Sequence, residues 1–167
     1  MAISKKNLGF TLIEILIVVT ALALLMVAGG NLLFGSLLGS SKSEILKEVK
    51  QNGEFALKII NDSIINASKL ELCDSKTLTI KNQNNQTITF KVINDQNNIP
   101  RLASNSSYLT SNKVKITNLS FICPSEEEIG SPPTIGINFT VSQAQETDRP
   151  EKKASLSFSA VATMRNY

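Results

Sequence analysis

A membrane-length apolar stretch at the start of the chain constrains the fold more than any other feature. Of the 25 residues from Phe10 to Phe34, 19 are apolar. As an α-helix this stretch would extend about 37 Å, which exceeds the roughly 30 Å thickness of the hydrocarbon core of a bilayer. We therefore expect residues 10–34 to form a membrane-spanning helix.

The rest of the 167-residue chain is more polar and has room for one further domain of ordinary size. The sequence contains no histidine, which excludes Ser-His-Asp triads and His-ligated zinc, and its two cysteines are too few for a four-cysteine zinc site. A formal net charge of +3 is too small to indicate a nucleic-acid-binding protein. We expect no enzymatic activity, no cofactor or metal, and no nucleic-acid partner.

One charged residue lies inside the apolar stretch. Glu14 is the sole charge between Lys6 and Lys42. A carboxylate in hydrocarbon costs about 2–4 kcal/mol, so an acid at this depth is a candidate functional residue. The alternative is an ordinary secretory signal cleaved near Gly29, but such signals have an apolar core of only about 7–15 residues.

The residues around Glu14 resemble a known processing signal. Lys5 and Lys6 precede Gly9 and Phe10, and Glu14 is the fifth residue after Gly9. This arrangement is similar to the type III signal of the type IV pilin and pseudopilin superfamily, in which a basic leader ends in glycine and phenylalanine follows. The resemblance implies cleavage between Gly9 and Phe10 by a prepilin peptidase and N-methylation of Phe10.

The resemblance also implies a topology and a role for the acid. Lys5 and Lys6 are expected to hold the leader in the cytoplasm, which places the C-terminal part outside it. Cleavage leaves a cationic amine on Phe10, and Glu14 lies one helical turn away. In the family this glutamate is thought to pair with the amine of a neighbouring subunit, so we expect Glu14 to set subunit register during assembly.

These inferences define an expected location and set of partners. The chain is expected to be a single-pass protein of the cytoplasmic (inner) membrane that later joins a filament in the cell envelope or at the surface. Its expected partners are other pilins or pseudopilins, the prepilin peptidase, the inner-membrane assembly platform and membrane lipid.

A helical period returns after residue 41. Apolar residues recur at spacings of three, four or seven, and most charged residues occupy the other faces. This stripe comprises Ile45, Val49, Ala56, Ile60, Ile64 and Ala67. It predicts an amphipathic continuation of the helix over residues 35–72, ending near Glu71 and packed against a sheet.

Beyond residue 72 the apolar period becomes two, which is typical of strands. We expect a phase slip in the third strand to be a β-bulge, and a further short edge strand to lie near residues 99–102. The main strands are expected near residues 77–81, 87–92, 114–121, 135–141 and 156–164.

Together these patterns predict an α+β fold, with a long N-terminal helix packed on an antiparallel β-sheet. This arrangement is similar to the globular domain of pilins. The expected segments are a leader (1–9), a transmembrane and assembly helix (10–34), its amphipathic continuation (35–72) and a β-sheet domain (73–167).

The two cysteines, Cys73 and Cys123, lie outside the expected membrane span. In an exported domain a disulfide is the default for such a pair, although two free buried thiols remain the alternative. The acidic run Glu126–Glu128 lacks the aspartate-rich spacing of a calcium loop, so we expect it to be a solvated loop.

Three functions remain open at the level of sequence. The chain is expected to be a minor pilin or pseudopilin, and residues 110–121 and 164–166 are similar to J-like and W-like minor subunits. The alternatives are a major pilin of a filament shaft and a membrane-tethered adhesin or DNA-uptake module. The sequence does not distinguish type II secretion, type IV pilus and competence systems.

Overall fold

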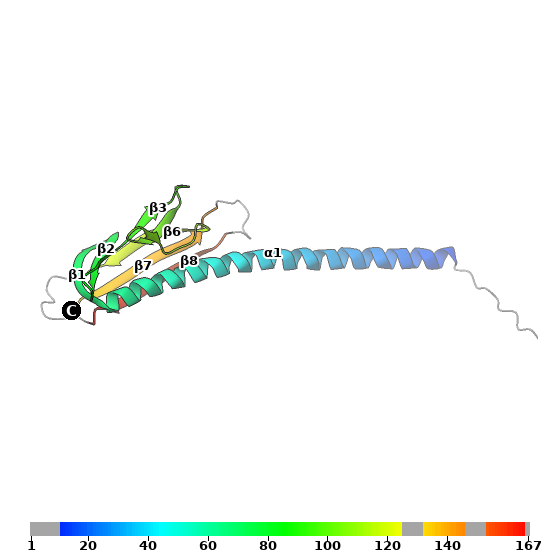
Figure 1. The fold of residues 1–167 in the computed structure, drawn as a ribbon. Coiled ribbons are helices and arrows are strands. Elements are labelled where there is room, and N and C mark those ends of the chain that lie inside the picture. The colour runs from blue at the N-terminus through cyan, green and yellow to red at the C-terminus, as the bar shows by residue number, and fades with distance from the viewer. Residues whose placement is uncertain (1–10, 125–131, 146–152, 166–167) are drawn as a thin grey trace, which may run out of the picture. The chain divides into compact units, whose positions relative to one another are not determined.

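The computed structural model describes residues 11–124, 132–145 and 153–165. The chain divides into two compact units, Met1–Ser40 and Ser41–Tyr167. A single helix, α1 (Leu12–Ile65), forms the described part of the first unit and continues into the second. All the strands belong to the second unit (Figure 1).

The described strands of the second unit form two antiparallel sheets, and within each sheet every strand pairs with its neighbours in sequence. This confirms the expected α+β fold, but the single expected sheet is divided in two. The first sheet contains β1 (Ala67–Asp74), β2 (Thr77–Asn82), β3 (Thr87–Asn94), β4 (Pro100–Ser104) and β5 (Ser107–Tyr108) in that order. The second sheet contains β6 (Val114–Ile122), β7 (Thr134–Gln143) and β8 (Ser155–Thr163), also in chain order.

The helix ends earlier than expected. The amphipathic continuation was expected over residues 35–72, but α1 ends at Ile65 and β1 begins at Ala67. Asn66 closes the last turn, because its backbone N–H and its side-chain Nδ2 both donate to the carbonyl oxygen of Asp62, at 3.1 and 2.8 Å. Side chains of this kind compete with the helix for backbone groups and favour its end.

The apolar spacing of β1 explains the error. Ala67, Leu70 and Cys73 all contribute to the core side of the domain, with a helix-like spacing of three. In the structure this spacing arises from two register shifts in the pairing of β1 with β2, one on each side of Leu70. A bulged strand therefore presents every third residue to the core, as a helix would.

The sheets contain the expected bulge and place residues 99–102 differently from expectation. The phase slip expected in the third strand is a register shift in β6 between Thr117 and Ser120, where Asn118 adopts a positive φ of 53°. This confirms the bulge. The segment near residues 99–102 was wrongly expected at an edge, because β4 lies between β3 and the two-residue strand β5.

The core of the second unit lies between the later part of α1 and both sheets. The expected helix stripe supplies four fully buried side chains, which are Val49, Ala56, Ile60 and Ile64. The sheets supply the other large buried residues, among them Leu78, Ile80, Phe90, Leu102, Ile135, Ile137 and Phe139. Burial of this set is the main driving force for folding of the unit.

A disulfide joins the two sheets. Cys73 lies in β1 of the first sheet, and Cys123 follows β6 of the second; their Cα atoms are 5.7 Å apart. Close by, the N–H of Phe121 donates to the carbonyl oxygen of Ser75 at 2.9 Å. The structure thus contains the expected disulfide, and its place in the fold is the seam between the sheets.

Gly53 on α1 permits a close approach of β8. The aromatic ring of Phe158 lies against the helix backbone here, in the space that a Cβ at residue 53 would occupy. The same ring stacks on Phe139 of β7, with ring centroids 5.5 Å apart. A residue with no side chain is therefore required at position 53, although glycine in a helix interior costs about 1 kcal/mol.

We expect Gly53→Ala to lower the free energy of unfolding by about 1–3 kcal/mol, because the new methyl group displaces the Phe158 ring. Chemical denaturation of the full chain in detergent, followed by circular dichroism, measures the change. In a Phe158→Ala background the same substitution should be neutral or stabilising. Gly39→Ala is the matched control, since a Cβ at Gly39 would meet nothing within 4 Å.

Candidate functional site at the start of the helix

The residues that the sequence singles out near the N-terminus fall into two groups. Lys5, Lys6, Gly9 and Phe10 lie outside the described residues. Glu14 is described and lies in the first turn of α1. The structural account of the site therefore begins at residue 11.

Thr11 and Glu14 cap the start of the helix reciprocally. The N–H of Glu14 donates to Thr11 Oγ1 at 3.3 Å, and the N–H of Thr11 donates to Glu14 Oε2 at 3.4 Å. This is a capping box, in which two backbone donors left free by the first helical turn are satisfied by side chains. Sequence reasoning missed this second role of Glu14, although the T-x-x-E spacing was a sufficient signal.

The capping geometry places a carboxylate at the positive end of the helix dipole. An acidic side chain in the first turn stabilises a helix through its interaction with the dipole. The capping box also fixes the carboxylate next to the backbone nitrogen of Thr11, the residue that directly follows Phe10. Glu14 is thus held close to the chain end that cleavage after Gly9 would create.

The helix that follows is apolar on all sides within the first unit. The large apolar side chains that the structure describes there are exposed, from 48% at Leu22 to 92% at Leu12. Its Thr20 hydroxyl donates to the carbonyl oxygens of Leu16 and Ile17, at 3.0 and 2.9 Å, so this hydroxyl does not require water. In the described part of the chain, α1 meets the length and composition of a membrane span near the N-terminus.

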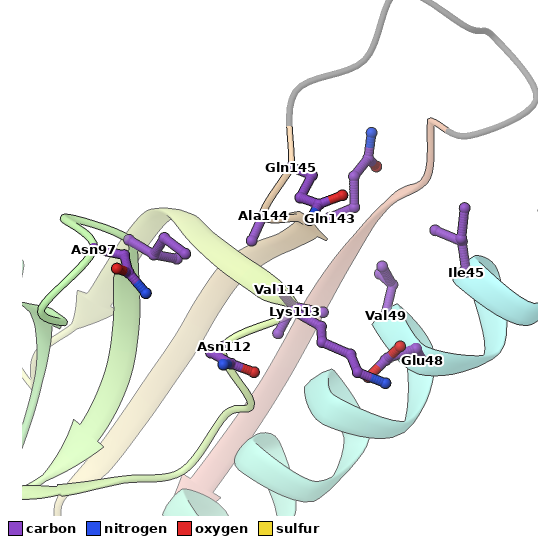
Figure 2. Close-up of a pocket in the computed structure, with 11 residues that line it drawn as sticks. Ile45, Glu48, Val49, Asn97, Asn112, Lys113, Val114, Gln143, Ala144 and Gln145 are labelled. Carbon is purple, nitrogen blue, oxygen red and sulfur yellow. The ribbon is translucent and has the colours of Figure 1, made fainter.

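A cavity of about 600 Å³ lies in the second unit between α1 and the ends of the strands (Figure 2). Its lining includes the apolar residues Val49 and Val114 and the carboxamide residues Asn97 and Asn112. Glu48 and Lys113 are the titratable groups of its lining, and they pair with each other at 3.3 Å. This composition offers no nucleophile beside a free base.

Metal ligands are also sparse. No cluster of three or more His, Cys, Asp or Glu side chains occurs among the residues that the structure describes. The acidic run Glu126–Glu128 lies outside those residues.

Comparison with known sequences addresses the N-terminal region. The sequence model of the prokaryotic N-terminal methylation motif matches residues 4–30. The chain carries this motif. The match supports the type IV pilin-like superfamily, and it spans the basic leader residues, Gly9, Phe10, Glu14 and most of the apolar stretch. No curated protein and no solved structure matches the chain significantly.

The motif and the apolar helix together fit a membrane-anchored pilin or pseudopilin that is processed by a prepilin peptidase. Such a protein associates in general with other pilins and with that peptidase.

Proposed function

We propose that this chain is a minor pilin or pseudopilin, a structural and non-catalytic subunit of a type II secretion or type IV pilus filament. The observation that carries the proposal is the methylation motif over residues 4–30, together with an apolar helix whose first turn carries the capping residue Glu14. The likeness of residues 110–121 and 164–166 to J-like and W-like subunits supports a minor rather than a major role.

In this proposal, the prepilin peptidase cuts between Gly9 and Phe10 on the cytoplasmic side of the membrane. Lys5 and Lys6 keep the leader on that side, and the second unit lies outside the cytoplasm. Phe10 is then N-methylated. The small Gly9 permits close approach of the protease backbone to the bond that is cut.

Assembly then depends on Glu14. A carboxylate in a low-dielectric membrane needs a cationic or hydrogen-bonded partner. In a single chain, the capping box supplies one hydrogen-bond donor to this carboxylate, the N–H of Thr11, but no positive charge. The amine of Phe10 in a neighbouring subunit provides a full positive charge, so subunit addition is favoured only where the two charges meet.

Processing provides the direct test of this function. Intact-mass measurement of the chain from cells that contain a prepilin peptidase should show loss of Met1–Gly9 and addition of one methyl group at Phe10. Gly9→Trp should block cleavage, because a bulky side chain obstructs access to the bond, and the chain should then keep its full mass. A mature N-terminus near Gly29 would contradict the proposal and indicate an ordinary secretory signal instead.

A further inference from the structure

Among the residues that the structure describes, no strand pairs with the outer edge of β8. β8 pairs with β7 on one side and ends the second sheet on the other. In an antiparallel strand, alternate residues direct their N–H and C=O groups away from the paired neighbour. Nine residues of β8, Ser155–Thr163, therefore present a row of hydrogen-bonding groups along this edge.

The other strand edges are protected in different ways. β5 has only two residues. β1 carries Lys69 and Glu71 and has two register shifts. The Lys81 ammonium lies 2.7 Å from Glu71 and lowers the pKa of that carboxyl, so the charge persists. β6 is interrupted by its bulge between Thr117 and Ser120. Short length, charge and bulges each discourage pairing with another chain.

β8 has none of these devices. Its sequence, SLSFSAVAT, contains no charged residue and no proline. Its register with β7 is unbroken from Ser155 to Thr163. A long, regular and uncharged edge of this kind is a template for a further strand.

The apolar face of the sheet is also incompletely covered at β8. On the neighbouring strand β7, the core-facing residues Ile137 and Phe139 are at most 2% exposed. The corresponding residues of β8, Leu156, Phe158 and Ala160, are only half-buried. Part of the apolar surface of β8 is therefore exposed to solvent, and a further strand beside β8 would extend the sheet and help to bury it.

We propose that the outer edge of β8 binds an extended strand of another pilin-type subunit, which adds a fourth strand to the second sheet. This inference rests on the proposed function, since that function supplies the partner. The partner strand would carry small apolar side chains toward Leu156 and Phe158, and uncharged polar side chains on the opposite face. Main-chain hydrogen bonds would provide affinity, and the alternate side chains would provide specificity.

Site-specific photo-cross-linking in the full chain tests this proposal. A photoreactive amino acid replaces Ser159 at the centre of β8 in cells that carry the complete filament machinery. Thr117 on β6, also exposed and at the opposite edge of the same sheet, is the matched control position. Leu24 in the apolar helix, which is 73% exposed, reports assembly independently of the sheet. We expect Ser159, and not Thr117, to cross-link to another pilin-type subunit identified by mass spectrometry.

Each other outcome overturns the proposal. A cross-link at Leu24 without one at Ser159 would refute the edge contact and leave the proposed function intact. The absence of cross-links at both positions would refute both. A cross-link from Ser159 solely to a second copy of this chain would refute the proposed partner. Cross-links of equal yield from Thr117 and Ser159 would refute the proposed edge.

A charge variant gives a second, quantitative test. Ser159→Lys combined with Val161→Lys places two cations on the edge strand, which should reduce co-purification of partner subunits roughly tenfold. Gln83→Lys with Asn84→Lys adds the same charge in the exposed turn between β2 and β3 and should have no effect. Retention of the Cys73–Cys123 disulfide verifies folding of both variants. Equal co-purification of the two variants would overturn the proposal.

Discussion

Replacement of Cys73 and Cys123 together by serine will lower the free energy of unfolding of the second unit by about 4 kcal/mol. The two residues are 50 positions apart in sequence, so the disulfide closes a long loop and removes many conformations of the unfolded chain. Its loss also removes the covalent link between the two sheets, which leaves the hydrogen bond from the Phe121 N–H to the Ser75 carbonyl oxygen close by. Denaturant unfolding of the full chain in detergent, followed by circular dichroism, measures the effect.

Reduced wild-type protein is the matched control for this experiment. It lacks the same covalent link without any change of sequence, so its midpoint of unfolding should approach that of the double variant. A difference between oxidised wild type and double variant of less than about 1 kcal/mol would contradict the prediction, since loop closure alone predicts several times more.

The second large effect concerns assembly rather than stability. Glu14→Ala should still enter the membrane and be cleaved after Gly9, because the leader is unchanged. Its recovery in filaments, or with partner pilins, should fall more than roughly tenfold, because loss of one member of a buried charge pair costs about 2–5 kcal/mol. Quantitative mass spectrometry of sheared filaments and of the membrane fraction separates the two measurements.

The capping box provides a way to separate the two roles of Glu14. Glutamine also serves in a capping box, so Glu14→Gln should keep the helix start but lose the charge. Thr11→Ala should keep the charge and lose the cap, at a cost of about 1 kcal/mol. If charge pairing controls assembly, Glu14→Gln should be as defective as Glu14→Ala, and Thr11→Ala should be nearly normal. An assembly-competent Glu14→Gln variant would contradict the charge-pairing role.

The features that sequence reasoning identified correctly depend on local pattern. The apolar stretch and the methylation motif around Glu14 are contiguous in sequence, so both can be recognised without knowledge of the fold. The amphipathic stripe from Val49 to Ile64 is equally local, because every third or fourth residue of a helix must face the same side. The bulge in β6 was visible because it shifts the alternation of apolar residues by one position.

The errors occurred where pairing with another strand overrides the local pattern. Ala67, Leu70 and Cys73 have a helical spacing, and only their pairing with β2 turns that segment into a bulged strand. The division into two sheets depends on contacts that alternation cannot reveal, because each strand has the same period in either sheet. The capping partner of Glu14 is a different case, since the Thr11 signal was present in the sequence and was not used.

The sequence by itself determined that this chain has a pilin-type N-terminus, an apolar helix with one acid, and an α+β domain with two cysteines. These follow from composition and spacing along one stretch of chain. The tertiary structure decided which sheet each cysteine belongs to, why residue 53 must be glycine, and which strand edge is left open. Those properties depend on which segments meet in space, and burial and hydrogen bonding between distant residues select that arrangement.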